Sequence, residues 1–380
     1  VALGIVAAAD ALGWVLGPIW GAAILQIFGG WRPIFLLNIP IGLIAGAVLV
    51  LAWRGPRRVA SPTVNGSSRD ILGAGLLSMA LVCINLGASS GGEAGATSGQ
   101  AALGATPNPL EPYQVPLLIA GVVALVAFLL VERRASDPLV PLGLFRDRRF
   151  SAANTTNALV GAALMVAMAN VPLLITLLST ESDSALVSAE LLSVFSLMMA
   201  VGSVVGGRAV SRLGYRAVTW VGLIVAAGGF FRMSDWPAAI AMGRMAGDLA
   251  VTGLGFGLVI APIGASAINA ARHADIGIAS ALVIVMRLIG MTVGISALTA
   301  WAVGRLNQAL AALPPLQQQV GESLADYFAR QQQFAADQVI PLTLGVVRDT
   351  YLVAAIICLV ALLPAVLLPR RAENALVEPD

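Results

Sequence analysis

Residues 13–42 read GWVLGPIWGAAILQIFGGWRPIFLLNIPIG, two apolar runs joined by a short glycine turn. Gly13, Gly17 and Gly21 are spaced so that on a helix they share one face, where another backbone can approach closely. Pro18 removes one hydrogen bond from that helix and permits a kink. Glycine and proline are tolerated in membrane helices because neighbouring helices satisfy the freed backbone groups. The stretch predicts two consecutive membrane-spanning helices.

The composition of the whole chain extends this prediction. Of its 380 residues, 58% are hydrophobic and 11% are charged, with a mean hydropathy of +0.88. Soluble proteins average about 25% charged residues, so this chain cannot cover itself with a water-facing surface. No basic face for nucleic acid is present in the sequence. The composition therefore predicts a polytopic membrane protein.

Apolar runs long enough to cross the bilayer core of about 30 Å recur along the chain. They predict an all-α fold with ten spans and no strands. The chain begins at Val1 and enters an apolar run at once, without the basic start and cleavage site of a signal peptide. We therefore expect further sequence upstream. The predicted spans are 1–28, 33–53, 71–88, 115–131, 150–178, 187–206, 217–233, 247–270, 276–304 and 349–369.

Arginines in the connections predict the orientation. If the first run crosses outward, the arginine-rich connections 54–69, 133–149 and 207–216 all fall inside, and the inner arginines outnumber the outer ones. The outer connections 89–113 and 179–186 contain no arginine or lysine. The positive-inside rule thus predicts a cytoplasmic C-terminus in the bacterial cytoplasmic membrane.

Several other classes of function are disfavoured by the residues present. Cys83 and Cys358 lie in separate apolar runs and are expected to be buried free thiols. His273 is the only histidine, which excludes a histidine-cluster metal site and argues against a lipid-modifying enzyme. The sequence has no phosphate-binding loop, so ATP is not expected to be the direct energy source. We expect no cofactor, and a proton gradient as the driving force.

The motif that follows the Gly-Pro helix carries a resemblance. Together the first two runs resemble the fifth and sixth helices of the fourteen-helix drug:proton antiporter branch of the major facilitator superfamily. In that family the Gly-Pro element is the antiporter motif, a kinked and tightly packed helix that restrains leakage. The motif residues are Gly13, Gly17, Pro18 and Gly21, and the signature residues are Trp31, Arg32, Phe35, Asn38, Pro40 and Gly42.

A second motif resembles the cytoplasmic gate of the same family, where basic residues at a tight inner loop pair with helix ends and acidic groups. Ser211 stands where the family often has an acidic residue, so this copy is degenerate, and ordinary positive-inside arginines remain an alternative. The expected gate residues are Gly207, Arg208, Arg212, Gly214 and Arg216.

The resemblance continues through 253–306. There the chain is similar in particular to the mycobacterial lipid and multidrug exporters of that branch, most clearly at 277–281, 287–290 and 300–308. It implies fourteen helices, of which about ten are present, and an extracytoplasmic lipid-binding lipoprotein as a partner. The implied divisions are the last two helices of an N-terminal lobe (1–53), two linker helices (54–149), a six-helix C-terminal lobe (150–371, with an extended outer segment at 306–345) and a cytoplasmic tail (372–380).

Charged residues inside spans are functional candidates, because a charge in the bilayer core is costly. Arg287 lies about eleven residues, roughly 16 Å, from the inner end of its span, near the midplane. Asp10 lies nearer the inner mouth, where it is a candidate proton-titrating acid or a solvated rim acid. The mycobacterial exporters that the chain resembles have the acid one position later, where this chain has Ala11. Arg244 and Asp248 are expected to be rim charges.

Residues 306–345 form an unusually long outer segment. Leu316, Val320, Leu324 and Phe328 recur every four residues and predict an amphipathic helix. We expect the last two spans to extend beyond the bilayer into a ridge that guides lipid tails, or else a packed cap without that role.

The sequence thus favours a proton-coupled efflux transporter for amphiphilic drugs or lipids, in contact with membrane lipids and a hydrophobic substrate. A proton-coupled importer of the same fold is the first alternative, and a membrane-embedded lipid-modifying enzyme is the second.

Overall fold

The computed structural model describes residues 13, 17, 20–21, 23–30, 32–53, 71–89, 111–135, 140, 142–178, 184–237, 240–271, 275–313 and 323–370. All regular structure in these ranges is helical. The elements are α2 (Arg32–Trp53), α3 (Ile71–Ser89), η2 (Glu111–Tyr113), α5 (Gln114–Glu132), η3 (Leu142–Arg146), α6 (Arg148–Leu178), α7 (Ser184–Met233), α8 (Met242–Asn269), α9 (Ile276–Ala311), α10 (Leu324–Phe334), the π-helical η5 (Ala335–Val339), α11 (Ile340–Val360) and α12 (Leu362–Ala365).

The helices match the predicted spans in order. Six helical stretches in the described ranges are long and apolar enough to cross a membrane, and α2 and α3 contain shorter apolar stretches. Helix α7 accounts for two predicted spans, because its backbone breaks at Gly214 (φ 80°, ψ 165°) and reverses direction there. The predicted first span, 1–28, lies largely outside the described residues.

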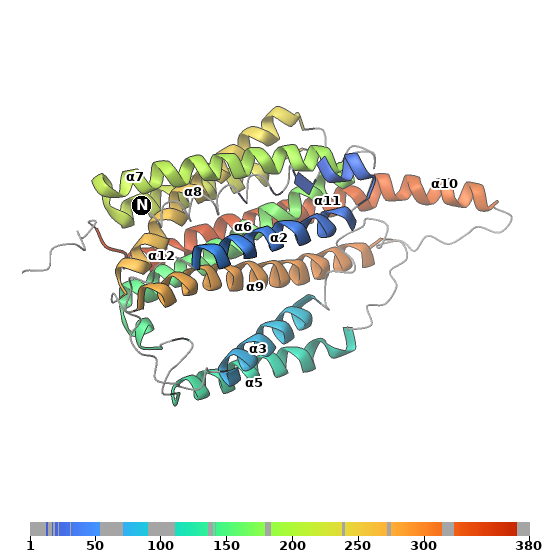
Figure 1. The fold of residues 1–380 in the computed structure, drawn as a ribbon. Coiled ribbons are helices and arrows are strands. Elements are labelled where there is room, and N and C mark those ends of the chain that lie inside the picture. Colours follow the sequence, from blue (N-terminus) through green and yellow to red (C-terminus); the bar gives the residue numbers. More distant parts are fainter. Residues whose placement is uncertain are drawn as a thin grey trace, which may run out of the picture.

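Helices α6, α7, α8, α9 and α11 pack into one main bundle, and α3 pairs with α5 beside α9 (Figure 1). The two ends of the main bundle differ. At the loop end, α7 turns at Gly214 and α12 follows α11. At the extended end, α6 and α9 finish and α10 projects away from the bundle (Figure 1).

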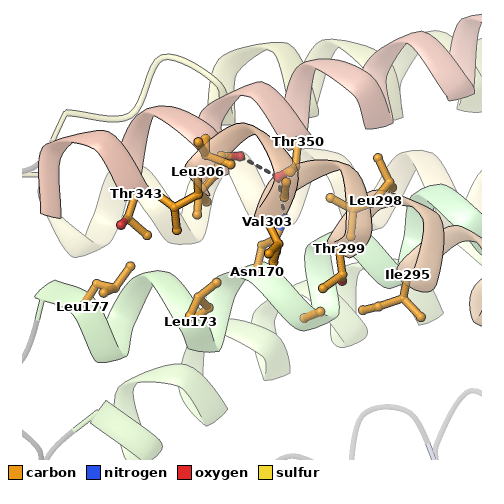
Figure 2. Close-up of a pocket in the computed structure, with 15 residues that line it drawn as sticks. Asn170, Leu173, Leu177, Ile295, Leu298, Thr299, Val303, Leu306, Thr343 and Thr350 are labelled. Atoms are coloured by element: carbon orange, nitrogen blue, oxygen red, sulfur yellow. Dashed lines mark hydrogen bonds between the residues drawn. The ribbon is translucent and has the colours of Figure 1, made fainter. Parts of the chain in front are cut away.

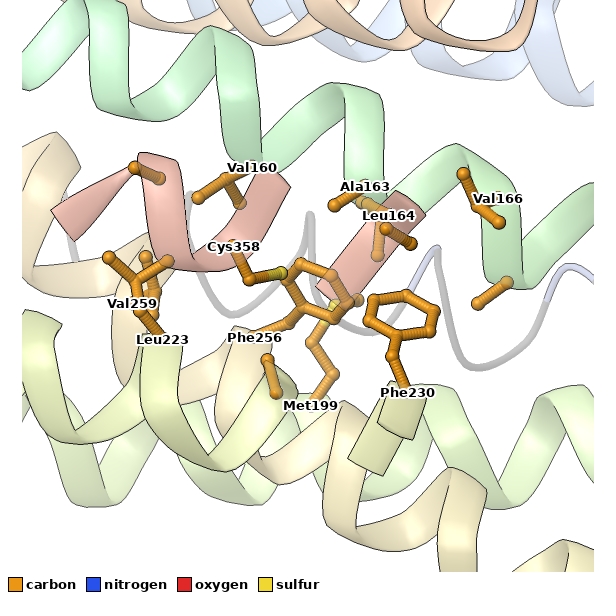
Figure 3. Packing of buried hydrophobic residues seen from close by; sticks show 14 of the residues in the cluster. Val160, Ala163, Leu164, Val166, Met199, Leu223, Phe230, Phe256, Val259 and Cys358 are labelled. Atoms are coloured by element: carbon orange, nitrogen blue, oxygen red, sulfur yellow. The ribbon is translucent and has the colours of Figure 1, made fainter. Parts of the chain in front are cut away.

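Aromatic side chains fill the centre of the main bundle (Figure 3). Phe256 of α8 lies edge-on to Phe195 and to Phe230, both in α7, with ring centroids 6.1 and 5.8 Å away. Cys358 of α11 is buried in the same core, as predicted, whereas Cys83 of α3 is only half-buried. Helix α8 can approach α7 closely because Gly257 has no Cβ. A Cβ at this position would collide with the backbone of α7.

The last span differs from its predicted limits. The sequence places it at 349–369, but α11 begins at Ile340 and is continuous through η5 with α10, so one helical stretch covers Leu324–Ala365, 42 residues. Part of the predicted amphipathic helix is therefore present as α10, while 314–322 lie outside the described residues. Ser323 caps α10 by accepting a hydrogen bond from the backbone N–H of Asp326 at 3.1 Å.

Candidate functional site

A pocket lies between α6, α9 and α11, in the half of the main bundle nearer the extended end (Figure 2). It contains about 730 Å³ that protein atoms leave unfilled, including the part open at its mouth. Leucine, isoleucine, valine and alanine make most of its walls. The polar side chains of the lining are Asn170, Thr299, Thr343 and Thr350. An apolar wall with a few placed polar groups is the usual lining of a site for hydrophobic ligands.

The contact between α6 and α9 on the loop-end side of this pocket is very close. A Cβ at Gly290 would strike the backbone of Ala158, so only glycine fits there. The buried side-chain amide of Asn157 donates to the carbonyl oxygen of Val283 at 2.6 Å across the same interface. Backbone contact through small residues, with a hydrogen bond added, is how membrane helices associate without a hydrophobic driving force. This crossing holds α6 and α9 together on the loop-end side of the pocket.

One hydrogen-bonded chain crosses the pocket wall from α6 to α11. The Nδ2 of Asn170 donates to Oγ1 of Thr350 at 2.6 Å, and that hydroxyl donates to the carbonyl oxygen of Val347 at 2.6 Å. Thr343 donates to the carbonyl oxygen of Val339 at 2.9 Å. Both hydroxyls are thus used by the protein. The hydroxyl of Thr299 has no hydrogen bond to another described residue, so it is available to a ligand.

An ion pair joins α9 to α11 near this pocket. Arg305 and Asp349 are 3.4 Å apart, with side chains 57% and 39% exposed. The guanidinium of Arg305 also lies 5.9 Å from the ring centroid of Trp301. Ion pairs this exposed contribute about 0–1 kcal/mol, so this one adds little to the stability of the bundle.

Arg287 is half-buried in the middle of α9. Its backbone packs against Gly161 of α6, where a Cβ would collide with it. A second, apolar groove lies between α3 and α9, lined on the α9 side by Val285, Leu288, Ile289 and Thr292. The Arg287 side chain is therefore not fully exposed on the surface of the bundle. The role of Arg287 in transport stays a prediction.

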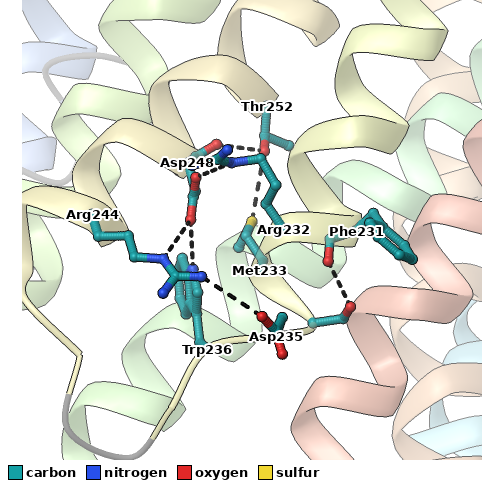
Figure 4. Close-up of polar contacts among 9 residues, drawn as sticks. Phe231, Arg232, Met233, Asp235, Trp236, Arg244, Asp248 and Thr252 are labelled. Carbon is teal, nitrogen blue, oxygen red and sulfur yellow. Dashed lines mark hydrogen bonds and ion pairs between the residues drawn. The ribbon is translucent and has the colours of Figure 1, made fainter.

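Asp248 corrects one expectation. We expected Arg244 and Asp248 to be rim charges, but the Asp248 side chain is only 1% exposed (Figure 4). It accepts hydrogen bonds from Nε of Arg232 at 2.6 Å and from Nε1 of Trp236 at 2.9 Å. Arg244 lies 4.0 Å from the same carboxylate and 3.8 Å from the exposed Asp235. The carboxylate is buried because α7, the turn after it and α8 close over it. The sequence prediction considered only how near Asp248 is to the end of its span, and that position does not show whether the side chain is buried.

The predicted gate residues lie at the turn inside α7, at the loop end. Arg208 and Arg212 are exposed, in helix and not in a loop, because the turn is reduced to Gly214. The backbone N–H of Arg216 donates to the carbonyl oxygen of Pro369 at 3.2 Å, and its guanidinium lies 5.4 Å from the Trp220 ring centroid. Gly207 is exposed, with no described atom near its missing Cβ. Arg216 of the motif thus contacts the segment that follows α12.

The structure describes the three glycines of the antiporter motif but not its proline. Asp10, Pro18 and Trp31 are outside the described residues, while Gly13, Gly17 and Gly21 are helical. Arg32, Phe35, Asn38, Pro40 and Gly42 lie on exposed positions of α2. The packing role of this motif therefore stays a prediction.

Sequence reasoning missed the polar residues of α6 and of the turn. Asn157 and Asn170 bridge to α9 and α11, and Asn269 of α8 donates to the hydroxyl of Tyr215 at 2.7 Å. The available signal was an asparagine inside or at the end of an apolar span, because such a side chain needs a partner there. The partner itself depends on which helices meet.

These observations define the class of protein. It is a multi-pass, all-helical membrane protein with a bundle of apolar helices, an apolar pocket between three of them, and, in the described part of the chain, buried polar groups that join helices.

Residues 1–295 match the Major Facilitator Superfamily, so the chain belongs to this superfamily of transporters. A triacylglyceride transporter of Mycolicibacterium hassiacum is 39% identical over 328 residues, which cover 82% of this chain and 58% of the relative. A probable triacylglyceride transporter of Mycobacterium leprae is 33% identical over 394 residues, covering 98% of this chain and 71% of the relative. The triacylglyceride transporter of Mycobacterium tuberculosis is 33% identical over 395 residues, covering 98% and 70%.

Proposed function

We propose that the protein is a proton-coupled efflux transporter that moves lipids, and other amphiphilic molecules, out across the bacterial cytoplasmic membrane. Membership of the Major Facilitator Superfamily supports transport by a secondary carrier. The relatives that are 33–39% identical over most of the chain are named triacylglyceride transporters, which supports a neutral lipid as the substrate.

The extended end is the observation that carries the proposal. Helix α9 has 36 residues, about 54 Å of helix, and Leu324–Ala365 has 42. A bilayer core of about 30 Å needs only about 20 residues, so both helical stretches continue beyond it. Helix α10, at the start of the second stretch, projects beyond the end of the main bundle where α9 finishes (Figure 1). A small polar drug does not need such an extension, whereas a lipid leaving the bilayer must keep its chains out of water.

The exposed face of α10 suits that task. Leu324 and Phe328 are 65% and 57% exposed, one turn apart on the same side of the helix. Apolar side chains exposed in pairs on a projecting helix are costly unless they meet another apolar surface. We infer that they contact the lipid, and that an extracytoplasmic lipid-binding lipoprotein receives it there.

Orientation and energy follow from the charges. The positive-inside rule assigns the loop end, with Arg208, Arg212 and Arg216, to the cytoplasm, and the extended end to the outside. Asp10 and Arg287 are the charges proposed for the proton and substrate path. A carboxylate that alternates between wet and dry surroundings can take up and release a proton in each cycle.

The proposal is tested with the protein in liposomes that contain fluorescent triacylglycerol, with lipid-free albumin outside as acceptor. With an imposed pH gradient, the rate of lipid transfer should be at least tenfold higher than in matched liposomes in which an ionophore has collapsed the gradient. The Arg287→Ala variant should lose this increase, while the matched control Arg305→Ala, a change in the exposed ion pair of the same helix, should keep it. Equal transfer with and without the gradient would overturn the proposal.

A further inference from the structure

The pocket between α6, α9 and α11 has a shape and a lining that limit what it can hold. Its lining runs from Val166 to Leu177 on α6 and from Ile295 to Leu306 on α9. Each of these stretches rises about 16 Å along its helix. Because the lining follows α6 and α9 lengthwise, the pocket suits an extended chain better than a ring system.

Three of the four polar side chains of the lining lie together in the middle of its length, while Thr343 lies nearer the extended end. Figure 2 shows Asn170, Thr299 and Thr350 close together, with Leu173 and Leu177 on one side of them and Ile295 on the other. Thr350 is already used by Asn170 and Val347. The carbonyl oxygen and second N–H of Asn170 have no partner among the described residues, and neither does the hydroxyl of Thr299. These groups can hydrogen-bond one polar group in an otherwise apolar ligand.

The charges around the pocket decide the sign of that ligand. Among the residues that the structure describes, none with a charged side chain lines it. The nearby Arg305 and Asp349, which bridge α9 and α11, already neutralise one another. An anionic headgroup inside the pocket would be buried without a counter-charge, which is far costlier than burying an ester that accepts one hydrogen bond.

We propose that this pocket binds one acyl chain of a neutral ester lipid, with the ester carbonyl accepting a hydrogen bond from Thr299 or Asn170 and the chain lying along the leucines of α6. This inference rests on the proposed function, because it makes the transported lipid the occupant. It adds a site within the main bundle, at the extended end from which α10 projects, where a chain would be held before it leaves the bilayer.

The test is photolabelling of the protein in liposomes with a triacylglycerol that carries a diazirine in one acyl chain. The labelled residues are then mapped by peptide mass spectrometry. We expect adducts on α6, α9 and α11 at lining positions. Ala302→Phe places a ring in the pocket and should reduce these adducts at least fivefold. The matched control Ala297→Phe, on an exposed position of the same helix, should leave them unchanged.

The hydrogen-bond claim has its own variant. Thr299→Val keeps the shape of the side chain and removes its hydroxyl, so it should weaken labelling by the triacylglycerol probe. A hydrocarbon probe without an ester should label this variant and the unsubstituted protein equally. Loss of labelling by both probes would show that the change merely disturbed the fold and would leave the hydroxyl without the proposed role.

Parallel measurement of gradient-driven lipid transfer separates the two proposals. Transfer of triacylglycerol with adducts only outside α6, α9 and α11 would overturn this inference and leave the proposed function standing. Stronger labelling of the pocket by a diazirine phosphatidylglycerol than by the neutral probe would show a resident phospholipid and also overturn it. Labelling of the pocket without any transfer would contradict the proposed function instead.

Discussion

At the scale of single residues, the described polar side chains in the bundle mainly hold helices together. The Asp248 carboxylate, 1% exposed, binds Arg232 and Trp236 and so ties the end of α7 to the start of α8. Asn157 ties α6 to α9, and Asn170 ties α6 to α11. A buried charge or polar group that loses its partner is costly, so substitutions at these three residues should be destabilising.

Replacing Asp248 should therefore destabilise the protein. In Asp248→Asn the neutral amide cannot balance Arg232, and we expect a loss of about 2 kcal/mol, below the value for fully buried pairs because Arg232 is largely exposed. The measurement is the thermal unfolding midpoint of the purified protein in detergent. Asp235→Asn is the control, since that side chain is 90% exposed and its pair with Arg244 is 3.8 Å apart. Equal shifts in both variants would contradict the assigned role of Asp248.

At the scale of helices, local sequence predicted most of the elements and little of their packing. Each span follows from its own hydropathy, so spans such as 150–178 and 276–304 have counterparts in α6 and α9. The limits of α11 were missed because a helix that leaves the bilayer no longer needs to be apolar. The pocket could not be predicted, since it depends on the distance at which α6, α9 and α11 meet.

The close crossing of α6 and α9 gives a second prediction. A Cβ at Gly290 would collide with the backbone of Ala158, so Gly290→Ala should push the helices apart and lower the yield of folded protein. Gly304→Ala, on the same helix, meets no described atom and should gain up to about 1 kcal/mol from helix propensity. Monodispersity in size-exclusion chromatography and the unfolding midpoint measure both. A Gly290→Ala variant as stable as Gly304→Ala would contradict the backbone contact.

Helix α10 gives a third prediction. Changing the exposed Leu324 and Phe328 to glutamine should slow triacylglycerol transfer at least fivefold and leave efflux of a small cationic dye unchanged, because only the lipid needs an apolar path beyond the bilayer. The matched control changes Gln332 and Gln333 of the same helix to serine. Unimpaired lipid transfer by the folded Leu324→Gln, Phe328→Gln variant would favour the alternative of a packed cap.

At the scale of the whole molecule, the two ends of the main bundle have different characters. The loop end presents the exposed arginines around Gly214, and the extended end presents α10. Asp10, a candidate proton-titrating acid from the sequence, and Pro18 of the antiporter motif lie outside the described residues. The chain spans 58–71% of the lengths of the three relatives compared, so the activity of the whole protein is a proposal.

Coupling between outward lipid movement and inward proton movement is the central claim, and it can be measured from the proton side. In liposomes that enclose a pH-sensitive dye and start with equal pH on both sides, addition of an external lipid acceptor should draw triacylglycerol out and acidify the interior. The two signals should rise together, and both should disappear in Arg287→Ala. Departure of the lipid with no change in internal pH would contradict the account.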